Sequence, residues 1–179
     1  RPSKKEEKMI AYLKAFGEKH NLETKVDEAG NVLIKKPATP GKENLKTVIL
    51  QSHVDMVCEK NNDTDHDFLT DPIETEIDGE WMKAKGTTLG ADNGIGVATE
   101  LAILADDSIE HGPIECLFTV DEETGLTGAF ALKEGFMSGE ILLNLDSEDE
   151  GELYIGCAGG IDTVAEFQYE NEMTPISHL

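Results

Sequence analysis

Apolar and polar residues follow one another along the chain with two different periods, which predicts strands alternating with helices. Short apolar runs, several rich in β-branched residues, predict strands at 23–26, 31–35, 46–55, 115–120, 141–145 and 153–155. Residues 74–77 and 80–84 flank an Asp78-Gly79 pair, and such a pair between two short strands predicts a β-hairpin. A similar turn is expected at 28–31.

Three segments have helical spacing instead. The first follows a capping-box pair, Ser3 and Glu6, and its apolar residues are Met9, Ile10, Leu13 and Phe16. The second opens at Asn93 or Gly94, and its expected apolar face is Ile95, Leu101, Ala102, Leu104 and Ala105. The third covers 127–134, with Gly135 as the residue that ends it. Strands alternating with helices predict an α/β layered sheet.

The chain carries a strong excess of acid. Its 179 residues include 37 Asp and Glu against 15 Lys and Arg, which gives a net charge of −22. Such a surface would repel nucleic acid and anionic membranes, and no apolar run approaches the roughly 20 residues that span a bilayer. The excess fits either a well-solvated surface or carboxylates that bind cations, and composition alone does not choose between them.

The cysteine pattern indicates a reducing compartment. Cys58, Cys116 and Cys157 are odd in number and widely spaced, so they predict no disulfide framework. Two of them lie in apolar runs, which predicts buried thiols. Because the first residues also lack the apolar core of a signal peptide, we expect a cytoplasmic protein. A chain that starts with Arg1 rather than Met is expected to be a segment of a longer protein.

Candidate chemistry begins at the end of the strand at 46–55. His53 and Asp55 are two residues apart, so in a strand they point to the same face, where the carboxylate can orient the imidazole for a metal. An ordinary hydrogen bond at a strand end is the simpler interpretation of this pair taken alone.

Three further acidic positions follow the same plan. Asp92 stands among glycines just before a helix, in a loop that lacks the lysine of a phosphate-binding loop. The run Asp121-Glu122-Glu123 and the single Asp146 each end an apolar strand. Taken singly, these are a helix cap and solvated turns, but together they place imidazole and carboxylates at successive strand ends. That donor set suits Zn²⁺, with Mn²⁺ or Co²⁺ as alternatives.

One acidic loop imitates a calcium site. Its spacing matches five positions of an EF-hand loop, but Phe68 replaces the glycine at position six and Pro72 breaks the following segment. The matching residues are Asp63, Asp65, Asp67, Asp71 and Glu74. We interpret the match as a coincidence in an acidic loop, with a weak surface Ca²⁺ site as the alternative.

Several segments together resemble the M20 family of zinc exopeptidases, and within it the subgroup that hydrolyses Xaa-His dipeptides such as carnosine. The segments that carry the resemblance are 50–57, 86–96, 121–125 and 144–148, with subgroup-like matches at 60–63, 79–81 and 156–162. The resemblance covers nearly the whole chain and becomes vague past about Val164. It implies a three-layer α/β/α domain with a mixed, mostly parallel sheet, hydrolysing dipeptides with two zinc ions.

The resemblance also implies a role for each matched residue. His53 and Asp146 would bind the first zinc, Asp55 would orient His53, and Asp92 would bridge the two ions next to a cis peptide to Asn93. Glu123 would bind the second zinc, and Glu122 would be the general base that takes a proton from the attacking water and passes it to the leaving amine.

The chain departs from the family in length. Family members continue into a lid or dimerisation domain and then return with a further zinc-binding His, so residues 1–179 are expected to be the N-terminal portion of the catalytic domain of a homodimeric protein. His178 lies in a polar tail without a family motif, and His20, His66 and His111 are interpreted as surface residues. Two hypotheses follow: part of a dipeptidase, or a catalytically incomplete, acidic metal-binding domain.

Overall fold

Five strands form one mixed sheet in the order β1-β2-β6-β3-β7. The strands are β1 Glu23–Val26, β2 Val32–Lys36, β3 Val48–His53, β6 Ile114–Thr119 and β7 Ile141–Asn144. β3 pairs in parallel with β6 and β7, whereas β2 is antiparallel to β1 and β6. All strands except β2 therefore run in one direction, which confirms the predicted mixed, mostly parallel sheet.

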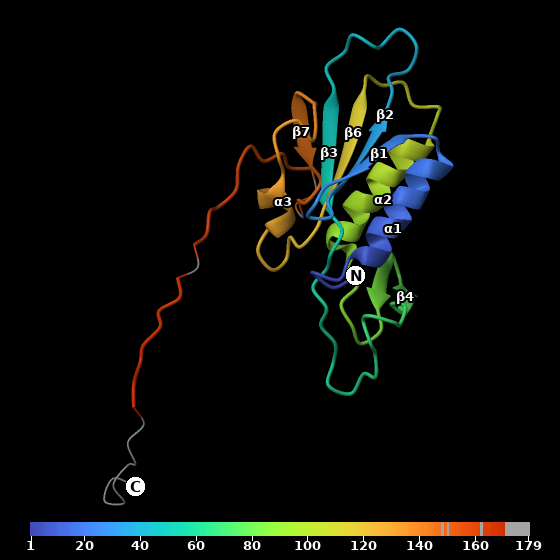
Figure 1. Cartoon of the computed structure of the whole chain (residues 1–179). Coiled ribbons are helices and arrows are strands. Elements are labelled where there is room, and N and C mark those ends of the chain that lie inside the picture. Colours follow the sequence, from blue (N-terminus) through green and yellow to red (C-terminus); the bar gives the residue numbers. More distant parts are fainter. Residues whose placement is uncertain (148, 150, 162, 171–179) are drawn as a thin grey trace, which may run out of the picture. The chain divides into compact units, whose positions relative to one another are not determined.

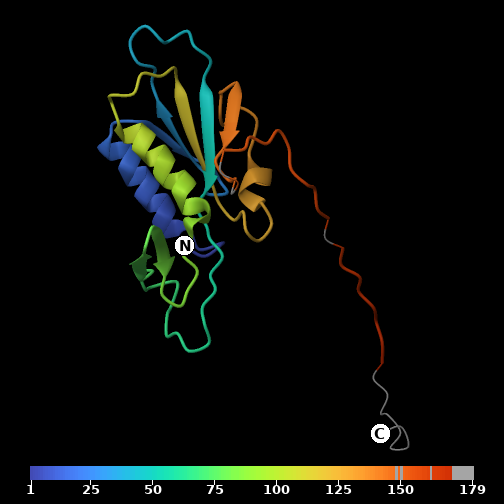
Figure 2. The ribbon, with the colours of Figure 1, turned by 180° about the vertical axis from the view of Figure 1, so that it is seen from behind.

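The structure is a computed structural model that describes residues 1–147, 149, 151–161 and 163–170. It divides into two units, Arg1–Glu148 and Asp149–Leu179, and every helix and strand of the described residues belongs to the first (Figures 1 and 2). Glu148, Asp162 and His178 lie outside the described residues. None of the helices among the described residues has the length and apolar character needed to cross a bilayer.

Helices cover both faces of the sheet. α1 Glu7–Lys19 and α2 Ala91–Ala105 lie side by side on one face, as Figures 1 and 2 show, where Leu13, Val97 and Leu104 join the larger core. On the opposite face, the segment that follows α3 Thr127–Ala131 packs Leu132, Phe136 and Met137 against the sheet. The predicted three-layer α/β/α arrangement is confirmed.

The predicted strands of the sheet are found to within two residues at each end. The hairpin is also confirmed: β4 Thr75–Asp78 and β5 Trp81–Ala84 pair antiparallel around Gly79, whose φ of 63° suits glycine. The strand predicted at 153–155 is wrong. A strand forms only against a neighbour, and these residues pair with no other described segment, leaving Leu153 97% exposed.

The predicted capping box is wrong because its two residues have distant partners. Ser3 donates its hydroxyl to Asp55 Oδ2 at 2.7 Å, and Glu6 Oε1 accepts the backbone N–H groups of Lys4 and Asp121. The helix then starts without a side-chain cap. At α3, the predicted end at Gly135 is also wrong, since Leu132 already leaves the helix to pack on the sheet.

The buried face of α2 agrees only in part with the predicted one. Its buried residues are Asn93, Gly96, Val97, Glu100 and Leu104, whereas Ile95 is 69% exposed. These buried positions follow the helical period, but two of them are polar. The predicted face is therefore confirmed at Leu104 and, half-buried against the core, at Leu101, and it is wrong at Ile95, Ala102 and Ala105, which are exposed. Glu100 is fully buried, and neither of its carboxyl oxygens has a hydrogen-bond partner among the described residues.

The cysteines are free, as predicted, but only Cys116 is buried. Cys58 is half-buried and Cys157 is exposed.

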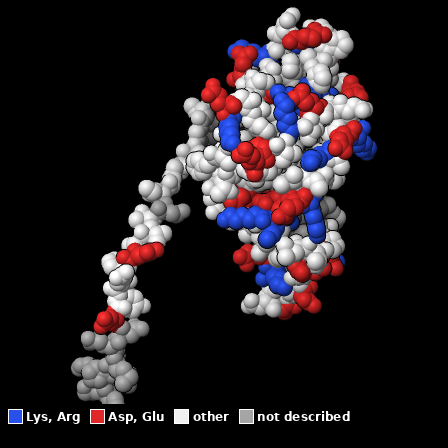
Figure 3. All heavy atoms as spheres, in the orientation of Figure 1, with Lys and Arg blue, Asp and Glu red and all other residues white. Residues whose placement is uncertain are grey.

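Acidic and basic side chains are interspersed on the face of the first unit that Figure 3 shows. Ion pairs such as Lys46–Glu140 and Lys133–Glu28 join exposed side chains, and such pairs contribute little to stability.

Burial makes Glu100 a source of pH-dependent stability. Burial raises the pKa of Glu100 well above its usual range. The nearby polar groups of Ser52 and Cys116 lower this pKa, but by less than burial raises it. The unfolded chain therefore releases this proton at lower pH than the folded chain, and stability falls with rising pH above about 4.3, the ordinary value for Glu.

We expect Glu100→Gln to be more stable than the wild type, by a margin that widens by up to about 1.4 kcal/mol per pH unit above that value. The free energy of unfolding, measured by urea denaturation between pH 5 and pH 8, tests this expectation. Glu134→Gln, at an exposed position, is the control. Parallel pH curves for wild type and Glu100→Gln would contradict the assignment of a neutral Glu100.

Candidate metal centre

Three parallel strands and one helix bring the candidate residues to one edge of the sheet. β3 ends at His53, and β6 and β7 end two residues before Asp121 and Asp146. β3 and β6 are in register at His53 and Thr119, so the segments that follow them leave the sheet at the same level. α2 starts at this edge with Asp92 in its first turn. The carboxyl ends of parallel strands are a common place for ligand sites in α/β sheets.

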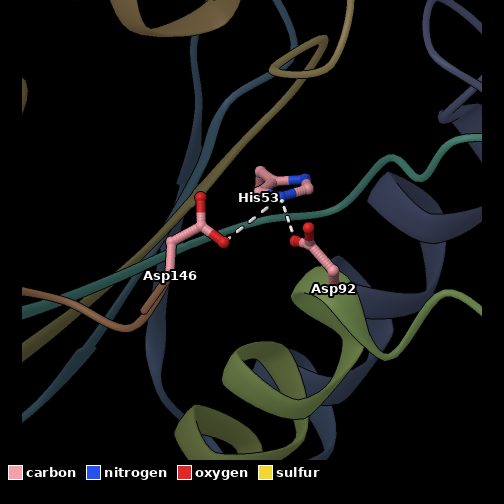
Figure 4. Close-up of side chains that lie close together, drawn as sticks. All are labelled: His53, Asp92 and Asp146. Atoms are coloured by element: carbon pink, nitrogen blue, oxygen red, sulfur yellow. Dashed lines mark hydrogen bonds and ion pairs between the residues drawn. The ribbon is translucent and has the colours of Figure 1, made fainter. Parts of the chain in front are cut away.

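His53 is the centre of this group. Its side chain is 1% exposed, and its Nε2 atom lies 3.0 Å from Asp92 Oδ1, 3.6 Å from Asp146 Oδ1 and 4.0 Å from Glu122 Oε2. Figure 4 shows the carboxylates of Asp92 and Asp146 pointing at the same ring nitrogen from two different segments. One imidazole nitrogen therefore faces carboxylates that come from separate parts of the chain.

The other ring nitrogen of His53 faces Asp55. Nδ1 lies 3.2 Å from Asp55 Oδ1, as the spacing of the two residues predicts. An ionised carboxylate can only accept, so this hydrogen bond puts a proton on Nδ1. Asp55 is completely buried and also accepts the backbone N–H groups of Glu122 at 3.1 Å and Glu123 at 3.2 Å. One carboxylate thus connects the end of β3 with the acidic segment after β6.

The charges in the group shift its pKa values in a consistent way. Burial opposes the charged form of His53, but the surrounding carboxylates, led by Asp146 and Asp55, outweigh it and raise the pKa of His53 to about 11. Burial acts against ionised Asp55 as well, yet the hydrogen bonds from His53, Ser3 and two backbone amides hold the pKa of Asp55 well below its usual range.

The pKa values of the two glutamates are raised, in contrast to that of Asp55. Burial, reinforced by neighbouring carboxylates and opposed by His53, raises the pKa of Glu122. Burial and the charge of Asp92 raise the pKa of Glu123. The pKa of Asp146 is lowered, mainly by its contact with His53. For both glutamates burial acts first and the neighbouring carboxylates add to it. The group carries more negative charge than one imidazole can balance, and such a group favours a cation.

The donor set fits divalent metal ions. Among the described residues, three groups each offer three ligand atoms within 4.8 Å of one another. They are His53, Asp92 and Asp146, then His53, Glu122 and Glu123, and finally the buried carboxylates of Glu6, Asp55 and Asp121, which include no imidazole. Imidazole nitrogen and carboxylate oxygen are the donors that zinc accepts in catalytic sites. The first group consists of the residues expected at the first metal. Only Asp92 and Glu123 are expected at the second metal within this chain.

Asn93 is a site residue that sequence reasoning considered only as a helix start and as the partner of a cis peptide. Its side chain is buried, and its Nδ2 donates to Asp146 Oδ1 at 2.5 Å and to the Leu145 carbonyl at 3.1 Å. The expected cis peptide between Asp92 and Asn93 is present. Asn93 thereby ties the start of α2 to the segment after β7. No local sequence signal predicts this contact, because its partners lie 52 and 53 residues away.

Ser3 is a second contributor that the sequence did not indicate, since its spacing from Glu6 suggested a helix cap.

The other histidines lie apart from this group. His20, His66 and His111 are half-buried rather than surface residues, and none of them occurs in a possible metal group of the described residues. The acidic EF-hand-like loop contributes no such group either within the described part of the chain.

Comparison with known proteins gives close relatives. The chain is 53% identical to the cytosol non-specific dipeptidase of Escherichia coli K12 over 174 residues, which cover 97% of this chain and 36% of that protein. The chain therefore spans just over a third of the length of this relative.

Solved structures agree with this relationship. The fold matches the crystal structure of aminoacylhistidine dipeptidase from Vibrio alginolyticus with a TM-score of 0.86 at 60% identity, over 88% of this chain and 32% of that chain. It also matches aminopeptidase PepT from Bacillus cereus with a TM-score of 0.70 at 28% identity, over 83% of this chain and 40% of that chain. The sequence model of peptidase family M20/M25/M40 matches residues 49–171, which include every candidate site residue from His53 to Asp146. The chain belongs to peptidase family M20/M25/M40.

Proposed function

We propose that this chain contributes to the metal-dependent hydrolysis of dipeptides, with Xaa-His dipeptides such as β-alanyl-histidine as substrates. The observation that carries the proposal is the position of His53 Nε2 within 3.0–4.0 Å of carboxylates from three separate segments. Relatives named dipeptidases support the peptide-bond chemistry, and the name of the Vibrio protein supports the preference for histidine. The name of the E. coli protein points to a broader range of dipeptides.

Two zinc ions are the proposed cofactors, with Mn²⁺ or Co²⁺ as alternatives. His53 and Asp146 would hold the first ion, Glu123 the second, and Asp92 would bridge them, while Asp55 keeps the proton of His53 on Nδ1 so that Nε2 is free to bind. When bound, the metal would supply a Lewis acid that polarises the scissile carbonyl and lowers the pKa of water.

Glu122 is the proposed general base. Its raised pKa brings it closer to the pH at which a carboxylate both takes up and returns a proton efficiently. Its backbone N–H is held by Asp55, so the same carboxylate that orients His53 also fixes the segment that carries the base. Glu122 would accept a proton from the attacking water and give it to the nitrogen of the leaving amine.

We further propose that residues 1–179 form the N-terminal portion of the catalytic domain of a homodimeric cytosolic protein. The name of the E. coli relative supports the location. The alternative function is an acidic metal-binding domain that binds one ion without turnover. It is favoured by one observation: among the described residues, no group of three possible ligand atoms contains both Asp92 and Glu123, the residues proposed for the second ion. Affinity falls as ligands are lost.

Removal of His53 tests the metal site. We expect His53→Ala to weaken zinc binding by more than about 100-fold, because it removes a ligand rather than an outer contact, whose loss costs 10–100-fold. Equilibrium zinc titration against a competing chelator measures the change. His66→Ala is the matched control, since His66 is half-buried and outside the site. Equal losses in both variants would argue against zinc at His53.

Removal of the base tests the mechanism. In hydrolysis of β-alanyl-histidine with added zinc, we expect Glu122→Gln to lower kcat by roughly 10²–10⁴-fold while zinc affinity stays close to that of the wild type. Glu123→Gln, one residue away, should instead weaken zinc binding. A wild-type chain that binds one zinc ion without turnover would favour the alternative function. Alanyl-alanine assayed in parallel distinguishes a histidine preference from broad specificity.

A further inference from the structure

The first six residues lie across the loops that carry the candidate metal site. Met56 N donates to the Arg1 carbonyl at 3.1 Å, and Pro2 and Met56 form an isolated parallel β-bridge. This segment therefore continues the hydrogen bonding of the chain beyond the end of β3. We refer to residues 1–6 as the N-terminal strap.

Arg1 joins two of the site loops. Its Nε donates to the Val54 carbonyl at 2.7 Å, and a terminal nitrogen donates to the Gly90 carbonyl at 2.7 Å. Val54 lies between His53 and Asp55, and Gly90 lies two residues before Asp92. A planar guanidinium that bonds both carbonyls holds these two backbone segments at a set separation.

The backbone of Gly90 is left-handed, which favours glycine, and the side chains of Arg1 and Met56 lie close to it. Its φ is 72°, and a Cβ atom there would lie 2.6 Å from Met56 Sδ and 2.9 Å from a guanidinium nitrogen of Arg1. The loop before α2 thus has no side chain where Arg1 crosses it. Arg1 and Met56 share this space, and neither of them is among the side chains that face His53.

Ser3 and Glu6 join the remaining segment. Ser3 donates to Asp55 Oδ2 at 2.7 Å, the oxygen that also accepts the N–H of Glu123. Glu6 is buried and its Oε1 accepts the N–H of Asp121 at 3.0 Å. The strap therefore has hydrogen bonds to every loop of the candidate site except the one after β7.

We propose that the N-terminal strap positions the metal site, with Ser3 acting through Asp55 on His53 and Arg1 setting the distance between the β3 end and Asp92. This role rests on the proposed metal-dependent function. Ser3 and Arg1 are positioning residues, because among the described residues neither forms a side-chain hydrogen bond or ion pair with a proposed metal ligand's side chain. A buried carboxylate that loses one of its donors shifts toward its remaining donors. Loss of the Ser3 hydroxyl is therefore expected to move Asp55, and Asp55 in turn orients His53.

Ser3→Ala tests the proposal with two readouts. We expect zinc affinity to fall by about tenfold, the lower end of the range for partners of metal-bound histidine. We also expect hydrogen exchange at the amides of Glu122 and Glu123 to become several-fold faster in the metal-free chain, since both bond to Asp55. Ser3→Thr keeps the hydroxyl and should restore both values. Arg1→Met, which keeps an apolar stem without donors, should weaken zinc binding without removing Ser3.

Ser138→Ala is the matched control. Ser138 donates its hydroxyl to buried Glu115 at 2.5 Å, away from the candidate site, so its loss should lower the melting temperature and leave zinc affinity and the two amides unchanged. Provided that zinc binding depends on His53, zinc affinity within twofold of the wild type in both Ser3→Ala and Arg1→Met would overturn the proposal, whatever happens to the exchange rates. So would equal effects of Ser3→Ala and Ser138→Ala.

The same measurements separate the strap from the proposed function. If zinc binding by the wild type is insensitive to His53→Ala, the proposed metal site fails. The exchange rates of the Glu122 and Glu123 amides then decide alone whether the strap positions this segment: faster exchange in Ser3→Ala supports it and unchanged exchange overturns it.

Discussion

The buried carboxylate of Asp55 is the interaction on which the site depends. A fully buried charge is stable only when it is paired and hydrogen-bonded, and Asp55 meets this condition with donors from three parts of the chain. Those donors are the His53 ring, the hydroxyl of Ser3 and the backbone of Glu122 and Glu123. Satisfying one charge therefore also orders the imidazole, the N-terminal segment and the acidic turn after β6.

The sheet supplies the framework for this convergence. Because β3, β6 and β7 run in parallel, their carboxyl ends meet at one edge, and residues from 53 to 146 arrive there on separate strands. The arrangement has a cost, because burial and then repulsion from neighbouring carboxylates raise the pKa values of Glu122 and Glu123. A cation that replaces the proton of His53 would relieve the repulsion, which connects the geometry of the edge with the metal chemistry proposed for it.

Much of the fold was predictable because its signals are local. The strands of the sheet and the hairpin at Gly79 follow from short apolar runs and a turn dipeptide, and each ends within two residues of its predicted position. The failures share a cause, which is dependence on distant parts of the chain. Residues 153–155 have no strand neighbour among the described residues, and Ser3 has a distant acceptor. The face of α2 was predicted only in part, because Glu100 and Asn93 are polar yet buried.

The sequence by itself determined the kinds of groups that meet at the sheet edge. A histidine and an aspartate two residues apart must share a face of an extended strand, and acids that end parallel strands must gather at one edge. Tertiary structure alone decided which atoms face each other: Asn93 with Asp146, Ser3 with Asp55, and Arg1 between Val54 and Gly90. These contacts join residues 52 to 89 positions apart, and they depend on how whole elements pack rather than on any local pattern.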